Sequence, residues 1–308
     1  MVISRTRGLI RRRVKRLVEL TLASPSLARY FQNRSRGRTV ILAYHNIVPD
    51  SEPITGSPGA HVRLQDFRWQ MDLLQEYCEV VPLDGLTDAD HGDSDQIRAV
   101  VTFDDAYAGT LRVALPELER RGLPSTVFVP TGHIGGGAFW WDEFRISGWE
   151  GSRVPLERLE GSASRVEAWA KANGVRSFPQ EPHQLPGSES ELLSAAELSQ
   201  VRFAVHTHDH LNLTQLDPER VRAQLATCRR WLSDRGIFPS EWVSYPYGLT
   251  SPEVEGTVRA LGYAGGVTIN GGYVPDGDWN PYHSPRLIIP AGVTPKNFLL
   301  RILGVISS

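Results

Sequence analysis

Two groups of metal-ligating side chains follow two apolar runs in this sequence of 308 residues. Residues 99–103 are apolar or β-branched, as in a buried strand, and they end at the adjacent carboxylates Asp104 and Asp105. Two carboxylates this close repel each other, so a cation must lie between them or one must hold a proton. A metal ion, with one acid as ligand and the other as base, meets this requirement. The alternative is an ordinary turn, where adjacent Asp residues are also common.

The second group is richer in nitrogen ligands. Residues 201–205 form another apolar run, and His206, His208 and His210 follow it within five positions, with Asp209 among them. Imidazole and carboxylate are the ligands of Zn²⁺ and similar divalent ions. Neither group contains the Cys ligands of a closed zinc module, so the predicted site keeps an open position for water.

Together the two groups resemble a known family. Thr102-Phe-Asp-Asp105 and His206-Thr-His-Asp-His210 are similar to the first two motifs of the polysaccharide deacetylases (NodB homology, carbohydrate esterase family 4). Tyr245-Pro-Tyr-Gly248 resembles the end of the third motif. The resemblance implies that Asp104 is the catalytic base and that one divalent ion, expected to be Zn²⁺, is bound by three ligands: Asp105, His206 and His210. His208 falls on a variable position of the motif and is left out of the ligand set.

The resemblance also implies an activity and a partner. It predicts a metal-dependent hydrolase that removes acetyl groups from N-acetylated sugars of a polysaccharide or glycoconjugate, by attack of a metal-bound water. Two alternatives stay open. One is an O-deacetylase, or a hydrolase of another non-peptide amide, on the same site. The other is a catalytically silent carbohydrate-binding protein.

Two departures from the family pattern concern proton transfer. Many members hold the base with an Arg in the third motif, where this chain has Ser244, and Arg286 is a candidate substitute. Many members also carry a late His as general acid, which is missing after Leu287. His45, at the end of the first predicted strand, is the alternative acid, because related deacetylases with a Tyr-His motif there use it so. It could instead only brace the metal site.

Aromatic residues near the motifs suit stacking on sugar rings, although any one of them could be a core residue. They are Trp140, Trp141, Tyr245, Tyr247, Trp279 and Tyr282. Among these we expect Trp141, Tyr245 and Tyr247 to contact substrate, together with Arg286. The resemblance further implies that the backbone N–H of Tyr247 points at the oxyanion.

Seven strands alternate with helices, which predicts a parallel α/β fold in one catalytic domain over residues 39–308. The resemblance implies a distorted (β/α)₇ barrel, similar to a TIM barrel. The predicted strands span residues 39–43, 99–103, 125–129, 201–205, 242–245, 264–268 and 286–289. Ser194 and Glu197 match a capping box ahead of a short helix. Residues 145–190 read as an insertion that covers part of the site.

The N-terminal segment, residues 1–38, differs in charge from the rest. It has eleven basic residues and one acid, whereas the remaining residues hold 22 of the 33 basic and 34 of the 35 acidic side chains. The body is therefore a poor nucleic-acid binder. The segment fits either a basic amphipathic helix on an anionic membrane surface, over residues 9–18, or a solvated leader.

Cysteine usage gives no reason to expect an oxidising compartment. Cys78 and Cys228 each fall in a helical pattern and are predicted to be buried free thiols. We expect a cytoplasmic protein, with residues 1–38 as a peripheral contact on the inner membrane face. The oligomeric state is not defined by the sequence.

Overall fold

The computed structural model describes residues 24–57, 59–87, 95–144, 154–275, 277 and 279–306. The amphipathic helix expected over residues 9–18 lies outside this range. Among the described residues, no helix combines the length and apolar character needed to cross a membrane.

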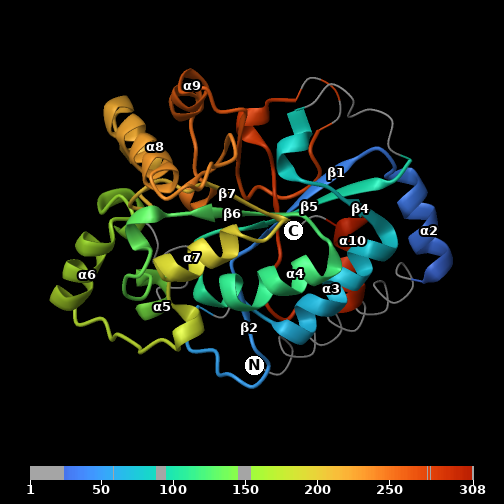
Figure 1. Cartoon of the computed structure of the whole chain (residues 1–308), viewed down its shortest axis with the longest axis horizontal. Helices are drawn as coiled ribbons and strands as arrows, with labels where there is room; N and C mark the ends of the chain where they lie inside the picture. Colours follow the sequence, from blue (N-terminus) through green and yellow to red (C-terminus); the bar gives the residue numbers. More distant parts are fainter. Residues whose placement is uncertain are drawn as a thin grey trace, which may run out of the picture.

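Seven parallel strands of the described chain build the wall of a barrel (Figure 1). They are β1 Thr39–Tyr44, β5 Ile97–Phe103, β6 Ser125–Val129, β7 Val201–Val205, β8 Trp242–Ser244, β9 Gly265–Val267 and β10 Leu287–Ile288. These are the seven strands that the apolar runs predict, with ends that differ by at most two residues. Their order along the sheet is β10, β1, β5, β6, β7, β8, β9.

The segment that leads into β10 closes the ring. Ser284 forms a parallel bridge with Val267 of β9, and a few residues later Leu287 pairs with Leu42 of β1. The last strand therefore contacts both edges of the sheet. This confirms the predicted distorted barrel in one domain, and it brings the first and last strands together as a closed barrel requires.

Alternation along the strands separates two apolar cores. One side chain from each of six strands points inward and fills the barrel: Ile41, Val100, Phe128, Ala204, Trp242 and Val267. Their neighbours in sequence, such as Leu42, Val101 and Val205, point outward and pack under the surrounding helices. Because most strand residues are covered on both faces, most of them are apolar or β-branched, although Arg202 of β7 is exposed.

Helices surround the barrel on its outside (Figure 1). They are α3 Leu64–Tyr77, α4 Leu115–Arg121, α7 Glu189–Ala196, α8 Pro218–Ser233, α9 Pro252–Ala260 and α10 Pro295–Ile302. Local signals start and stop several of them. Asp217 accepts a hydrogen bond from the Arg220 N–H at the start of α8, and Gly122 ends α4 in the left-handed conformation.

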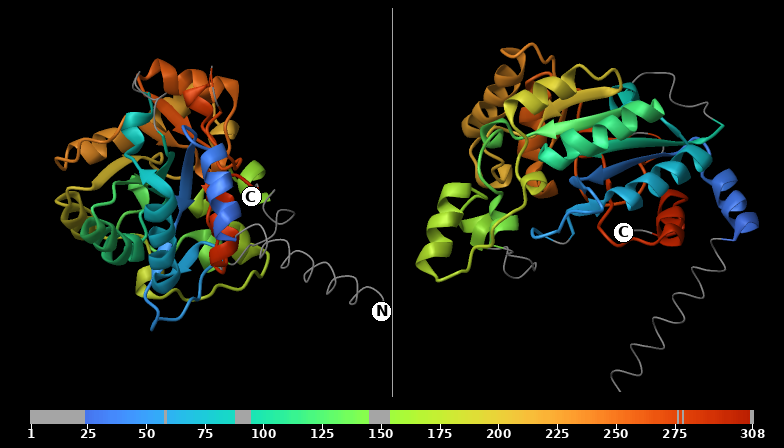
Figure 2. Two further views of the ribbon diagram at one scale, coloured as in Figure 1. Left: turned by 90° about the vertical axis from the view of Figure 1, so that its right-hand side faces the viewer. Right: turned by 60° about the horizontal axis from the view of Figure 1, so that its bottom comes forward.

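Two helices precede α7 in the segment between β6 and β7: α5 Trp140–Glu143, just before the predicted insertion of residues 145–190, and α6 Ala163–Ala172 within it. They pack around a small apolar cluster that includes Trp140, Leu156 and Val166. The helices α5 and α6 lie at one end of the molecule, and α2, Pro25–Arg34, lies at the other (Figure 1 and the right view of Figure 2).

The helix α2 corrects the expected boundary at residue 38. Ala28 is fully buried against the barrel core. The Ser35 hydroxyl donates to the Leu303 carbonyl (3.1 Å), and the Gln32 amide donates to the Tyr77 carbonyl (2.9 Å). Residues 25–38 are thus part of the folded body, because their side chains bind α10 and the end of α3.

Other local expectations also differ from the structure. Three short strands were not expected: β2 Asn46–Val48 pairs with β3 His61–Arg63, and β4 Cys78–Val80 pairs with β5. Cys78 thus begins a strand rather than ending a helix, although both cysteines are free and buried as predicted. The capping box at the start of α7 consists of Ser188 and Glu191, so the predicted pair Ser194 and Glu197 is wrong.

Candidate active site

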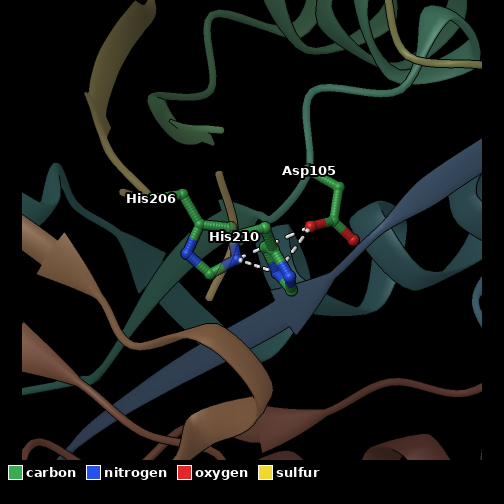
Figure 3. A group of neighbouring side chains, drawn as sticks. All are labelled: Asp105, His206 and His210. Atoms are coloured by element: carbon green, nitrogen blue, oxygen red, sulfur yellow. Dashed lines mark hydrogen bonds and ion pairs between the residues drawn. The ribbon is translucent and has the colours of Figure 1, made fainter. Parts of the chain in front are cut away.

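The expected metal ligands come together at the carboxyl ends of β5 and β7 (Figure 3). One ligand atom from each of Asp105, His206 and His210 lies within 4.8 Å of the other two, and all three residues are buried. Asp105 follows β5 by two residues, and His206 follows β7 directly. The carboxyl end of the strands is the face on which α/β barrels place their active sites.

The donor atoms of this triad fit a divalent cation. The Nε2 atoms of His206 and His210 face each other at 3.1 Å, and Asp105 Oδ1 lies 3.5 Å and 3.3 Å from them. His206 Nδ1 lies 2.7 Å from the Ser244 carbonyl, which can only accept, so Nδ1 carries the proton and Nε2 presents a lone pair to the centre. Asp105 Oδ1 makes no hydrogen bond of ordinary geometry although it is buried. One carboxylate and two imidazoles are a common ligand set for Zn²⁺.

The charges of Asp105 and His210 also suit a cation. Burial by itself raises the pKa of Asp105, but the facing imidazoles outweigh burial and hold the pKa well below its usual range. Burial lowers the pKa of His210 to about 4, so this imidazole is neutral at pH 7. An ionised carboxylate and a neutral imidazole are the forms that bind metal.

His208, which was left out of the ligand set, points elsewhere. Its Nδ1 lies 2.9 Å from the Thr131 hydroxyl, and its side chain is partly exposed. Asp209 instead accepts a hydrogen bond from the side-chain amide of Gln224 (2.7 Å) on α8. The residues between the two ligands thus attach the loop to the barrel and to α8.

The second carboxylate, Asp104, is held by a buried arginine. Arg286 donates two parallel hydrogen bonds to it, Nη1 to Oδ1 at 2.8 Å and Nη2 to Oδ2 at 2.6 Å. Burial raises the pKa of Asp104, but the Arg286 charge is the largest of several effects that together keep it below its ordinary value. Asp104 is therefore ionised near neutral pH, and its orientation is fixed by the fork of the guanidinium.

Arg286 itself has no donor left for a substrate. Nε donates to the Thr268 carbonyl (3.0 Å), and the other two N–H groups donate to Thr102 Oγ1 (3.1 Å) and Ser244 Oγ (2.9 Å). Its side chain is fully buried. The expectation that Arg286 contacts substrate is thus wrong, because all five donors of the guanidinium are engaged inside the barrel. Its position matches the substitute for the missing third-motif Arg, and Ser244 accepts a hydrogen bond from it.

A cavity of about 360 Å³ opens above Asp104 and the triad, and His45 lies on its wall. The walls are mostly apolar or aromatic. They include Trp140, Trp141, Leu156, Tyr247, Ile269, Ile288 and Pro290. The ring centroids of Trp141 and Tyr247 lie 4.8 Å and 4.7 Å from that of the ligand His210. Two of the predicted substrate contacts, Trp141 and Tyr247, are therefore placed beside the metal ligands.

A family model for polysaccharide deacetylases matches residues 91–266, more than half of the chain. The chain belongs to the polysaccharide deacetylase family. The matched range contains β5 and β7, together with Asp104 and the triad of Asp105, His206 and His210 at their carboxyl ends. Among curated protein sequences, none matches the chain.

Solved deacetylase structures share the fold at low sequence identity. The Streptococcus pyogenes deacetylase PplD, in complex with acetate, is 18% identical with a TM-score of 0.60, covering 86% of this chain and 98% of that one. IcaB from Ammonifex degensii is 19% identical with a TM-score of 0.58, covering 86% and 97%. A de-N-acetylase from Aggregatibacter actinomycetemcomitans is 15% identical with a TM-score of 0.56, covering 82% and 95%.

Three of the aromatic residues considered for sugar stacking lie away from the deacetylase cavity. Tyr245 is fully buried, and its hydroxyl donates to the Tyr282 carbonyl (2.8 Å), so the expectation that it contacts substrate is wrong. The Tyr282 hydroxyl donates to the Tyr263 carbonyl, and Trp279 stacks on Trp242 (6.3 Å between centroids). These rings support β8 and β9 rather than the cavity.

Parts of the cavity wall gave no signal in the sequence. Ser57, Gly59 and Ala60 reach it from the loop between β2 and β3. Leu156, by contrast, lies in the insertion over residues 145–190 that was expected to cover part of the site. The loop read only as a turn-rich surface segment, because its Gly, Pro and Ser residues define no chemistry by themselves.

Proposed function

We propose that the protein is a Zn²⁺-dependent N-deacetylase acting on N-acetylated sugar units, of the N-acetylglucosamine type, in a polysaccharide or glycoconjugate. Family membership supports deacetylation. The proposal that the bond cleaved is an amide, and that the cofactor is Zn²⁺, rests on the chemistry of the residues around the cavity.

Asp105, His206 and His210 would hold the metal ion. When bound, such an ion activates water and polarises the acetyl carbonyl. Asp104 would then take up the proton of the attacking water. Each of its carboxylate oxygens keeps a second lone pair beside the bond to Arg286, and the ionised state that Arg286 favours is the one a base requires.

The leaving amine needs a proton, and His45 is the residue we propose to supply it. His45 lies on the wall of the same cavity as Asp104 and Asp105. Expulsion of an amine without protonation would require an unstable anion, so an amidase needs such a group whereas an esterase with a good leaving group does not. Trp141 and Tyr247 would face the sugar or its acetyl group across the cavity.

One observation carries the proposal. A single cavity brings together a Zn²⁺-type triad, an ionised carboxylate clamped by an arginine, and an imidazole. A protein that only binds carbohydrate has no need of a buried carboxylate–arginine pair next to a metal site, because burial of charge is costly.

Acetate release tests the proposal. The full chain, loaded with Zn²⁺ or stripped by a chelator, is incubated with N-acetylated oligosaccharides, an O-acetylated glycan and an unacetylated control. We expect Zn²⁺-dependent acetate release from the N-acetylated glycans. Release from the O-acetylated glycan alone would favour the O-deacetylase alternative. Zn²⁺ binding without acetate from either glycan would favour a silent binding protein.

A further inference from the structure

A second buried carboxylate lies behind the aromatic wall of the cavity. Asp142 of α5 is fully buried. Its Oδ1 accepts hydrogen bonds from the Ser57 N–H (2.6 Å) and from His61 Nε2 (3.1 Å), and its Oδ2 accepts one from the Tyr107 hydroxyl (2.7 Å). Asp142 does not line the cavity, so it cannot act directly on the reacting atoms.

The direction of the hydrogen bonds made by His61 is set by its other neighbour. The Asn46 amide nitrogen lies 3.0 Å from His61 Nδ1 and also donates to the His183 carbonyl (2.8 Å). A carbonyl can only accept, so the atom that faces His61 is the amide NH₂, and Nδ1 must accept from it. Nε2 of His61 then carries the proton that is donated to Asp142. The hydrogen bonds from Asn46 through His61 to Asp142 therefore run in one direction.

The hydrogen bonds of Asp142 also extend to the cavity wall. The indole N–H of Trp141 donates to the Tyr107 hydroxyl (2.8 Å), which in turn donates to Asp142. The Trp141 ring also stacks on Phe139, with 4.6 Å between centroids and 9° between planes, and it lies beside His210. The indole of Trp141 is therefore held by Tyr107 at its N–H, by Phe139 on one face and by the neighbouring His210 ring.

A second part of the wall depends on the same carboxylate. The N–H of Ser57, a residue of the cavity wall, is bound by Asp142. The neighbouring Gly56 leaves room for this approach, since a Cβ there would lie 2.5 Å from His61 Nε2 and 2.7 Å from Asp142 Oδ1. Asp142 thus joins α5 to the loop between β2 and β3, and each of these segments supplies one side of the cavity.

From this convergence we propose that Asp142, acting through the Tyr107 hydroxyl, is a positioning residue that sets the orientation of Trp141 for binding the sugar. The inference rests on the proposed function for the identity of the ligand. It assigns to the Asp142–Tyr107–Trp141 chain a role in substrate affinity that is separate from metal binding and proton transfer. Burial of a carboxylate is costly, and here its hydrogen bonds organise the two walls rather than the barrel core.

The test is a double-mutant cycle in the Zn²⁺-loaded full chain. Tyr107→Phe removes one hydroxyl and leaves the other two donors on Asp142. It is measured alone and in a Trp141→Phe background, where the indole N–H is already absent. We expect Tyr107→Phe alone to raise KM for an N-acetylated oligosaccharide about five- to tenfold, the size of one lost hydrogen bond, with kcat and metal content unchanged. In the Trp141→Phe background it should change KM less than twofold.

An equal rise in KM in both backgrounds would overturn the proposal, because Tyr107 would then act independently of Trp141. A loss confined to kcat or to metal content would also overturn it. Asp142→Asn is the second variant, expected to raise KM at least as much, and its effect should likewise shrink in the Trp141→Phe background.

A spectroscopic measurement separates this proposal from the proposed function. Absence of acetate release by the native protein would refute the deacetylase and leave the orientation of Trp141 to be measured without substrate. The contribution of Trp141 to the near-UV circular dichroism is obtained by subtracting the Trp141→Phe spectrum from the native spectrum. The same subtraction is made in the Tyr107→Phe background, between the single and the double variant. The two difference spectra should not coincide, and identical spectra would overturn the positioning role.

Discussion

Left-handed backbone is concentrated at the site residues. Six non-glycine residues of the described chain have positive φ. Four of them belong to the motif segments, namely Asp105 (70°), Thr207 (65°), His210 (53°) and Tyr247 (61°), and Ala106 (49°) directly follows the first motif. This conformation costs about 1–2 kcal/mol for a residue with a side chain. The surrounding barrel must therefore hold these turns, which aim Asp105 and His210 at a common centre.

The ligand set can be tested by comparing two neighbouring histidines. His210→Ala removes one of three protein ligands, whereas His208→Ala removes a side chain that contacts Thr131. Loss of an outer hydrogen-bond partner alone costs about 10- to 100-fold in metal affinity, so loss of a ligand should cost at least that. Metal content after dialysis should fall in His210→Ala and stay unchanged in His208→Ala. A loss of metal in His208→Ala but not in His210→Ala would refute His210 as a metal ligand.

The Asp104–Arg286 pair should govern the acid side of the pH profile. In Arg286→Gln, burial still raises the pKa of Asp104 while the guanidinium that lowers it is gone. The pKa must rise, so the acid limb of kcat/KM should move to higher pH. Ser244→Ala, which removes one acceptor of Arg286 and keeps the pair, is the control and should move it little. An unmoved limb in Arg286→Gln would exclude Asp104 as the base.

The same pair gives stability with a defined sign. The folded pKa of Asp104 lies below its unfolded value, so the pair stabilises the native state above the unfolded pKa, and this is lost as pH falls through the folded pKa. Removing one partner of a buried pair costs about 3–5 kcal/mol. Urea unfolding of Arg286→Gln should show a loss of this order at pH 7, and a smaller loss at pH 4, where the uncompensated carboxyl can take up a proton.

His45 can be tested by changing the leaving group. His45→Ala should lower turnover of an N-acetylated sugar by about 10²-fold or more, because the amine must be protonated to leave. An activated acetate ester, whose phenolate leaves without a proton, should lose far less. Rates on both substrates, with metal content as control, decide the role. Equal losses would mean that His45 only supports the site.

At the scale of elements, the sequence predicts the barrel strands well because they are buried on both faces. Residues 125–129 and 201–205 are mostly apolar or β-branched, interrupted only by Ser125 and Arg202, and both form strands with those bounds. The strand β4 is missed because Cys78 continues the apolar spacing of α3, and only pairing with β5 separates the two. Short strands are set by their partners rather than by their own composition.

Motif spacing predicts which residues gather at the site, but not where each side chain points. The positions of Asp105, His206 and His210 agree with the motifs. Tyr245 belongs to the third motif segment and Arg286 precedes the place of the missing late His, yet both side chains are buried inside the molecule. The network on Asp142 joins segments more than 80 residues apart, so no local pattern could have revealed it.

At the scale of the whole molecule, the positive charge of residues 1–38 suggests that this segment contacts an anionic surface. Residues 1–38 carry eleven basic residues and one acid, and α2 lies at the end opposite to α5 and α6 (Figure 2). We propose a peripheral contact between the basic segment and an anionic membrane.

Vesicle co-sedimentation tests this contact. The full chain is compared with a chain that begins at Ser24 and so keeps α2, on vesicles with and without anionic lipid. The full chain should bind anionic vesicles more tightly, and binding should fall as salt rises from 0.05 to 0.5 M, since screening weakens charge attraction. Both chains should have the same melting temperature. Equal binding by the two would leave residues 1–23 without a membrane role.

The most direct test of the central claim is acetate release by Asp104→Asn, measured together with its Zn²⁺ content. The amide keeps the shape of the carboxylate beside Arg286 and the triad but cannot take up a proton in the same way. We predict that turnover of an N-acetylated oligosaccharide falls by at least about 10²-fold while Zn²⁺ content stays at the native level. Turnover within tenfold of the native protein, at full Zn²⁺ content, would contradict the assignment of Asp104 as the base of a metal-dependent deacetylase.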